Sequence, residues 1–110
     1  MAIYITRGNY SDHAFKGMLH HPEDRHDAVA KMFEAAGGKL VDYYITMGEY
    51  DFMVVSEFPN GVDALTALVV AAGTGGVRTL NTVAAYTTAD AKKAESKARK
   101  IAAGFKPAGG

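Results

Sequence analysis

The sequence predicts an α+β domain built around a four-stranded antiparallel sheet. Short runs rich in β-branched and aromatic residues alternate with longer segments of helical periodicity. Two of the strand-like runs, residues 40–47 and 50–58, are separated only by Gly48-Glu49, which predicts a tight hairpin. The chain has 110 residues, the length of one domain.

The first strand is expected at Ile3–Thr6, because isoleucine, tyrosine and threonine favour extended backbone. A turn follows, and Ser11 can cap a short helix that runs from about Asp12 to Leu19. Both segments are short, so the sequence predicts one strand and one or two turns of helix before the next break.

A second helical segment is expected to begin at Pro22. Proline fits a first helical position, and the carboxylates of Glu23 and Asp24 suit the positive end of the helix dipole. Gly37-Gly38 is expected to end this helix, because glycine adopts the left-handed cap without steric cost.

The second half of the chain continues the alternation. Pro59-Asn60-Gly61 breaks the third strand and opens a helix over Val62–Ala72. The fourth strand is expected at Val77–Tyr86. Residues 87–90 resemble a capping box for a last helix that reaches about Ala102.

This order is strand, helix, strand, strand, helix, strand and an added helix, which is the ferredoxin-like βαββαβ arrangement. In the third strand, Phe52, Val54 and Phe58 alternate with Met53 and Val55, so both faces of the sheet are apolar there. Helices are expected to cover one face only. We therefore expect a second copy to cover the other face in a two-fold homodimer, or a multiple of dimers.

The composition indicates the cellular compartment in which the protein is expected. The chain contains no cysteine, which excludes disulfides and thiolate chemistry and favours the cytoplasm. The first residues do not have the pattern of a signal peptide, and no apolar run approaches the ~20 residues that span a bilayer.

The charge divides the chain into a body and an arm. Net charge is zero, but beyond residue 88 six basic side chains stand against two acidic ones, giving +4 for the arm and −4 for the body. We expect a domain over residues 1–88, a basic helix over 89–103 and a mobile tail over 104–110.

Several blocks together resemble the GYD domain family over about residues 3–89. They are Gly37-Gly38-Lys39-Leu40, Tyr44, Gly48-Glu49-Tyr50-Asp51, Pro59 and Gly76-Val77-Arg78-Thr79. The resemblance implies a ferredoxin-like domain of the dimeric α+β barrel type, and it implies no mechanism. The chain departs from the family pattern at Asn60, in the loop 73–76, and in its histidines and basic C-terminal helix.

His13 and Asp51 are the candidate catalytic residues. A carboxylate at the head of an apolar strand loses hydration, which raises its pKa and suits it to act as a base. His13 stands at the start of the first helix. The alternative for Asp51 is a structural lock, in which it accepts hydrogen bonds from amides of the turn while Gly48 supplies a positive φ.

Tyr44, Tyr50 and Arg78 are the candidate ligand-binding residues. The planar fork of Arg78 suits a carboxylate or phosphate, although a polar edge strand or an ion pair explains it equally. The six tyrosines can line a pocket for a planar ligand or serve as core and interface residues.

The histidine cluster, the glycine-rich loop and the basic helix are expected to form no metal, phosphate or membrane site. His13, His20, His21 and His26 match no standard ligand spacing, so no metal site is expected. The glycine-rich loop 73–76 follows a helix instead of preceding one, so it is not a phosphate loop. The basic helix has a weak apolar face of alanines and no interleaved aromatics, which argues against a membrane and against specific nucleic-acid binding.

Three functions stay open. The first is a homo-oligomeric small-molecule-binding or sensing domain, with its ligand in the cleft beneath Tyr44, Tyr50, Asp51 and Arg78. The second, by analogy of fold alone, is a cofactor-independent monooxygenase or isomerase. The third is an assembly or docking role for the basic arm. The sequence identifies no cofactor.

Overall fold

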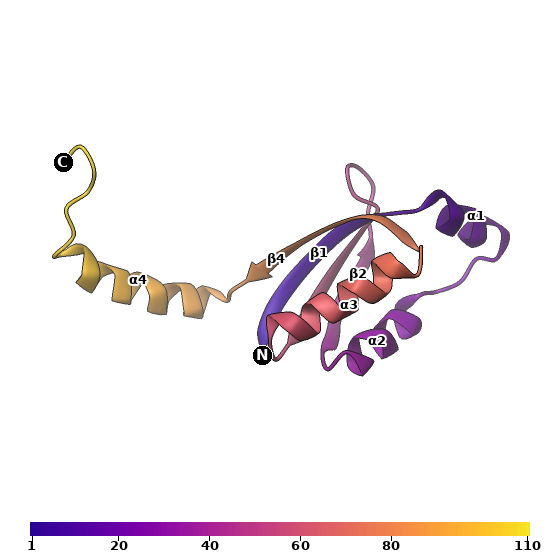
Figure 1. The fold of residues 1–110 in the computed structure, drawn as a ribbon, viewed down its shortest axis with the longest axis horizontal. Coiled ribbons are helices and arrows are strands. Elements are labelled where there is room, and N and C mark those ends of the chain that lie inside the picture. The colour runs from indigo at the N-terminus through magenta and orange to yellow at the C-terminus, as the bar shows by residue number, and fades with distance from the viewer.

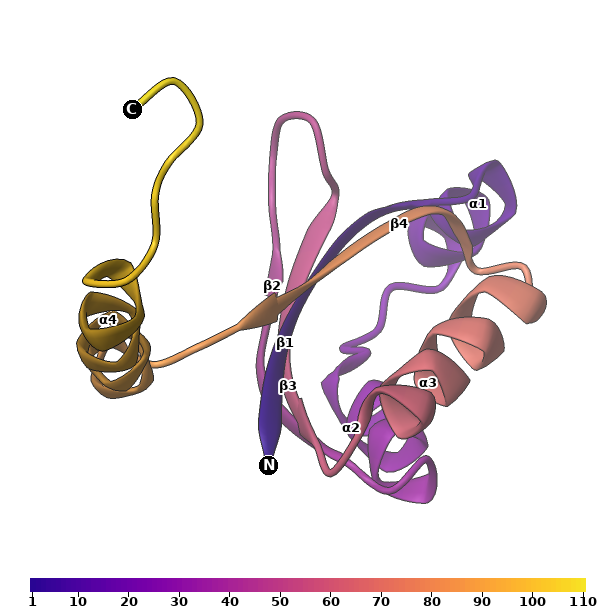
Figure 2. The ribbon, with the colours of Figure 1, turned by 60° about the vertical axis from the view of Figure 1, so that its left-hand side comes forward.

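The computed structural model describes residues 1–110 and contains a four-stranded antiparallel sheet with helices on one face (Figure 1). Its elements, in chain order, are β1 (Ala2–Tyr10), α1 (Asp12–His20), α2 (His26–Ala35), β2 (Lys39–Ile45), β3 (Phe52–Phe58), α3 (Gly61–Gly73), β4 (Val77–Ala85) and α4 (Thr88–Ala102). In Figure 2, α1, α2 and α3 lie on one side of the sheet, and α4 lies beyond the end of β4, away from the sheet.

The strand order is β2-β3-β1-β4, and every neighbouring pair is antiparallel. This confirms the predicted ferredoxin-like fold. Thr6 in the centre of β1 lies opposite Val54 of β3 and Thr82 of β4. The hydroxyls of Thr6 and Thr82 are 2.9 Å apart, so a side-chain hydrogen bond ties β1 to β4 on the helix-covered face.

The core is built from the inward side chains of β3. Phe52, Val54 and Phe58 are buried, and they alternate with residues that are only half-buried. Phe58 packs against Phe33 of α2, with ring centroids 5.6 Å apart. Two alanines of α3, Ala64 and Ala67, complete the core. The core thus extends along β3, from Phe52 beside Tyr10 to Phe58 beside Phe33.

The opposite face of the sheet carries no helix, and we call it the open face. The pairing of β1, β3 and β4 directs five apolar side chains to this face: Ile3, Ile5, Met53, Val55 and Val83. Val83 is 50% exposed. The prediction that helices cover only one of two apolar faces is thus confirmed for this chain.

The start of α2 differs from the prediction. The helix begins at His26, four residues after Pro22, and Arg25 at its N-cap makes no side-chain capping bond. The carboxylate of Asp24 accepts the N–H of His26 at 2.9 Å, a local turn that competes with helical backbone. The acidic residues after Pro22 therefore build a turn, and the predicted helix start was wrong.

The central hairpin also differs from the prediction. Six residues, Thr46 to Asp51, separate the strands, so β3 begins at Phe52 and the predicted two-residue turn was wrong. Thr46 closes this loop by donating its N–H to the carbonyl of Asp51 at 2.8 Å and its hydroxyl to the carbonyl of Tyr50 at 2.6 Å. Gly48 has the expected positive φ, +118°.

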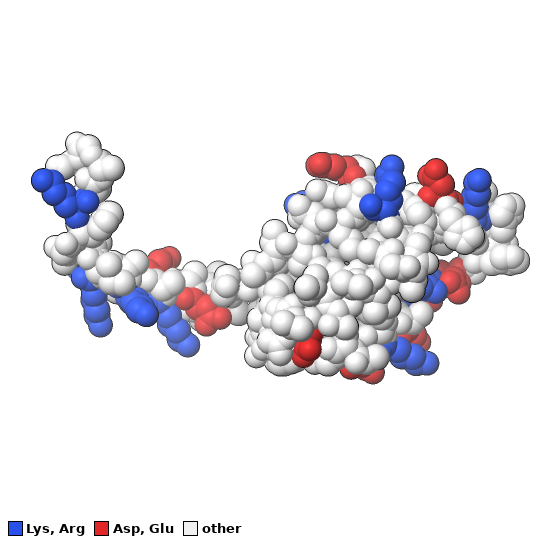
Figure 3. All heavy atoms as spheres, in the orientation of Figure 1, with Lys and Arg blue, Asp and Glu red and all other residues white.

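The C-terminal helix α4 projects from the body. All its residues are exposed, and the hydroxyl of Thr87 caps it by accepting the N–H of Asp90 at 3.0 Å. The radius of gyration is 18.1 Å, against about 13 Å for a compact chain of this length. Figure 3 shows lysine and arginine side chains spaced along this arm. No helix of the molecule combines the length and the apolar character needed to cross a membrane.

Candidate functional site

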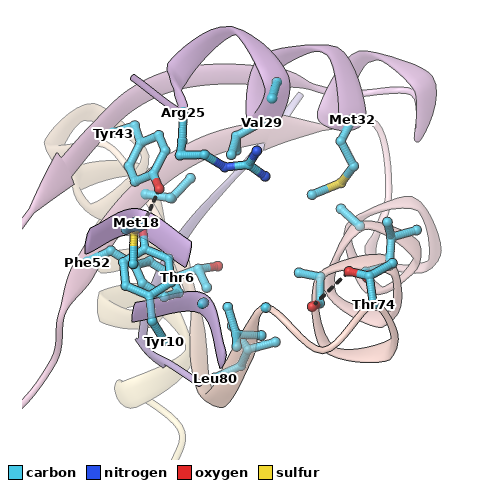
Figure 4. Close-up of a pocket in the computed structure, with 18 of the residues that line it drawn as sticks. Thr6, Tyr10, Met18, Arg25, Val29, Met32, Tyr43, Phe52, Thr74 and Leu80 are labelled. Atoms are coloured by element: carbon cyan, nitrogen blue, oxygen red, sulfur yellow. Dashed lines mark hydrogen bonds between the residues drawn. The ribbon is translucent and has the colours of Figure 1, made fainter. Parts of the chain in front are cut away.

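A cavity of about 490 Å³ lies between the helix-covered face of the sheet and helices α1, α2 and α3 (Figure 4). Most of its wall is hydrophobic. The lining residues are Thr6, Tyr10, His13, Ala14, Gly17, Met18, His21, Glu23, Arg25, Ala28, Val29, Met32, Phe33, Tyr43, Phe52, Val54, Ala67, Leu68, Val70, Ala71, Thr74, Gly76, Val77 and Leu80.

The cavity exists because the helices around it present small side chains. Ala14 and Gly17 of α1, Ala28 of α2 and Ala71 of α3 all line it. None of the residues of α1 is buried, so this helix covers the far end of the sheet without filling the space beneath it. The cavity is partly open to solvent, and its walls come from the sheet and from all three helices that cover it.

The tyrosine and threonine hydroxyls of the cavity wall are hydrogen-bonded within the protein. The hydroxyls of Tyr10 and Tyr43 form a short hydrogen bond, and the hydroxyl of Thr74 donates to the carbonyl of Val70 at 2.8 Å. Two phenols that share one hydrogen bond retain one further O–H. The tyrosine pair therefore offers one donor to a bound molecule.

Burial raises the pKa of the Tyr10 hydroxyl well above its usual value, and the hydrogen bond with Tyr43 raises the pKa further. The ring of Tyr10 is held by Phe52 and Phe15, at centroid distances of 5.0 and 5.7 Å. Tyr10 consequently stays protonated at neutral pH, where it donates a hydrogen bond and does not act as a base.

The charged residues of the cavity come from the segment between α1 and α2. Arg25 and Glu23 are about half-exposed, and Arg25 Nη1 lies 3.0 Å from Glu23 Oε1. Figure 4 shows the guanidinium between Tyr43 and Val29, turned toward the cavity. Arg25 is the one lysine or arginine among the lining residues.

The two predicted catalytic residues lie apart. His13 lines the cavity, whereas Asp51 does not. Asp51 Oδ2 accepts the N–H of Tyr10 at 2.9 Å, and its own N–H donates to the carbonyl of Gly8 at 2.8 Å. Asp51 thus anchors the hairpin loop to the end of β1. The structural alternative named the amides of the turn as its partners; the partner found is an amide of β1.

The predicted ligand-binding residues lie outside the cavity. Tyr44 pairs with Met53 on the open face and is 55% exposed. The ring of Tyr50 has the guanidinium carbon of Arg7 4.8 Å from its centroid. Arg78 is exposed on β4, the edge strand. The structure therefore does not bring these three side chains together around the cavity.

A bulge in β2 puts Tyr43, and not the predicted Tyr44, on the helix-covered face. Leu40 lies opposite Ser56, and the next paired residue is Asp42, opposite Val55, so Val41 is an extra residue. Regular alternation from Leu40 would turn Asp42 and Tyr44 toward the helices. The bulge reverses this and puts Tyr43 there instead. It also keeps the carboxylate of Asp42 out of the core.

The histidines are exposed and form no common site. His26 Nδ1 lies 3.2 Å from its neighbour Asp27, while His13 and His21 line the cavity. No group of three or more histidine, cysteine, aspartate or glutamate side chains is placed to hold a metal ion.

The fold and cavity define a ferredoxin-like α+β domain with a largely apolar cavity between its sheet and helices. The sequence profile of the GYD domain matches residues 4–94, most of the chain, and the protein belongs to the GYD domain family. No curated protein matches the chain at a significant level.

Three solved structures are similar to the chain at a low level. The crystal structure of FFRP-DM1 is 15% identical with a TM-score of 0.46, covering 78% of this chain and 100% of that one. The hypothetical protein PHS023 from Pyrococcus horikoshii is 15% identical, with a TM-score of 0.49 and coverages of 79% and 92%. TTHA0845 from Thermus thermophilus is 14% identical, with a TM-score of 0.45 and coverages of 79% and 95%.

Replacing Asp51 tests its anchoring role. Asp51→Ala leaves the part-buried N–H of Tyr10 without its acceptor, and we expect it to lower the free energy of unfolding by about 1–3 kcal/mol. Asp51→Asn retains an acceptor oxygen, so its free energy of unfolding should fall clearly less. Urea denaturation of both variants and the wild type measures the difference. Equal stabilities for alanine and wild type would show that Asp51 does not anchor the loop.

Proposed function

We propose that this protein is a small-molecule-binding domain whose ligand occupies the cavity between the sheet and α1, α2 and α3. The observation that carries the proposal is the cavity itself. Its volume, about 490 Å³, falls within the roughly 300–1,000 Å³ that is usual for ligand sites. Its walls combine an apolar surface with a few polar groups, which is the usual composition of such sites.

The enzymatic alternative is less well supported. A cofactor-independent monooxygenase or isomerase needs an acid or base that converges on the substrate. Of the two candidates, His13 lines the cavity and Asp51 is bonded to the backbone of β1 outside it. Tyr10 is held in its neutral form by burial. Of the two predicted catalytic residues, His13 is therefore the one on which an enzymatic role would depend.

Filling the cavity tests the binding proposal. Ala71 lines the cavity, and Ala72 beside it on α3 is exposed and does not. We expect 1-decanol, a neutral apolar probe, to raise the melting temperature of the wild type and of Ala72→Phe, because a ligand stabilises the state that binds it. Ala71→Phe should fill part of the space and abolish the rise. Circular dichroism of each variant checks that it is folded. Equal responses of the two variants would rule out the cavity as the binding site.

We further propose that the protein works as a homo-oligomer in which the open face of the sheet is an interface. Ile5, Val55 and Val83 form an apolar row across three neighbouring strands of this face. An antiparallel sheet that faced water would carry polar side chains here. A second copy offers the same surface, so two-fold packing buries both rows at once.

A charge placed on the open face should separate the subunits. Val83→Glu puts a carboxylate into the proposed interface, where it cannot be hydrated, and we expect a monomer by light scattering at micromolar concentration. Val69→Glu is the control, since Val69 of α3 is 61% exposed on the opposite side of the molecule. The interface is disproved if both variants keep the mass of the wild type, or if the wild type is itself a monomer.

A second candidate role, in assembly, is favoured by α4. The whole helix is exposed, and its arm carries +4 beside a body of −4. We propose that the arm docks on the acidic body of another copy, which provides charge of the opposite sign. This contact would join dimers into larger particles without involving the cavity.

Removing residues 88–110 tests the arm. We expect the truncated chain to keep its melting temperature, because α4 contributes nothing to the core. The full chain should form larger particles at low salt that dissociate as salt screens the charges, and the truncated chain should not. Analytical ultracentrifugation at two salt concentrations measures this. A particle mass that is unaffected by truncation would exclude the assembly role.

A further inference from the structure

We infer that the ligand of this cavity is an elongated apolar molecule that ends in a carboxylate or a similar anionic group, bound by Arg25. The inference rests on the proposed small-molecule function and adds the class of ligand. It depends on three features of the cavity: an apolar interior, a single guanidinium at one side, and a paired tyrosine donor.

The interior excludes ligands with many polar groups. Met32, Leu68, Val77 and Leu80 belong to the apolar wall and offer no hydrogen bond to a ligand. The threonine hydroxyls of the cavity are already bonded within the protein. A sugar or nucleotide would lose its hydration here without replacement, which costs about 1–3 kcal/mol for each unpaired group. A hydrocarbon chain loses nothing and gains from burial.

Arg25 supplies the charge that selects an anion. Its guanidinium has five N–H donors in a plane, and its ion pair with Glu23 uses Nη1 alone. The other donors remain free to bind a carboxylate through two parallel bonds. The pair with Glu23 is half-exposed and is worth little, so Glu23 does not hold the guanidinium away from a ligand.

The tyrosine pair adds a neutral donor on the same side of the cavity. Figure 4 places the Tyr43 hydroxyl beside the segment that carries Arg25, with Tyr10 next to it. The remaining O–H of the pair can be donated to a carboxylate oxygen. An anion therefore meets a positive charge and a hydroxyl together, whereas an ammonium group would meet the guanidinium as a like charge.

Glu23 lines the same part of the cavity and opposes the binding of an anion. A carboxylate bound at Arg25 lies close to the carboxylate of Glu23, and like charges repel. Neutralising Glu23 should therefore strengthen the binding of an acid, while neutralising Arg25 should weaken it. This gives two variants with opposite expected effects on one ligand.

The test compares decanoate with 1-decanol, which share a chain length and differ in charge. Calorimetry at pH 8 measures the dissociation constant of each for the wild type, Arg25→Met and Glu23→Gln, with decanoate kept below its micelle concentration. We expect Arg25→Met to raise the dissociation constant of decanoate at least tenfold and to change that of 1-decanol by less than twofold. Glu23→Gln should bind decanoate more tightly than the wild type and 1-decanol equally well.

The outcomes distinguish the two proposals. If the wild type binds neither compound, the proposed binding function fails. In another outcome, the wild type binds both compounds while Arg25→Met changes neither dissociation constant or raises both equally. In that case the cavity binds apolar molecules, and the role of Arg25 is overturned. Stronger binding of decanoate by Glu23→Gln supports the anionic class even if Arg25→Met proves to be unfolded, and its absence counts against that class.

Discussion

The arrangement of this protein depends on the alternation of side chains along β1 and β3, the two central strands of the sheet. Thr6 and Val54 lie opposite each other on the helix-covered face, and Ile5 and Val55 lie opposite each other on the open face. One pair of strands thus supplies both a wall of the cavity and the row proposed as an interface. At this pair both surfaces are apolar, unlike those of a sheet that is half in water, whereas Glu57 and Arg7 put charged groups on the open face on either side of it.

The cavity forms because the helices pack closely against only part of the sheet. Phe33 and Phe58 pack at one end, where α2 and α3 approach the sheet. At the other end, α1 lies over the sheet with small residues beneath it and with no buried side chain. Tyr10 and Tyr43 close that end with a hydrogen-bonded pair, so the open space is bounded by aromatic groups and is not filled by them.

Much of the fold could be predicted from the sequence, because the periodicities of its strands and helices are regular and its turns carry glycine or proline. The features that could not be predicted depend on single local bonds. Asp24 accepts the N–H of His26 and delays α2, and Thr46 closes a loop of six residues where two were expected. The sequence pattern reveals neither the acceptor role of Asp24 nor the bonds that Thr46 donates to the carbonyls of Tyr50 and Asp51.

The candidate site was harder to predict than the fold. His13 was named for its place near the start of the first helix, and it lies in the cavity wall. Tyr43 and Arg25 could not be placed, since one depends on a bulge and the other on an irregular segment. Tyr10 ends β1, and only its packing against Phe52 and its bond to Tyr43 show that it faces inward.

The bulge at Val41 also affects how the chain is compared with its relatives. Because Val41 is the residue in excess, a chain without it would pair regularly and still direct Tyr43 inward and Asp42 outward. A chain that kept Val41 but straightened the strand would bury the Asp42 carboxylate beside Val54 and turn Tyr43 away from Tyr10. When β2 of this chain is aligned with β2 of a relative, the equivalent positions are therefore better counted backward from Phe52 than forward from Gly38.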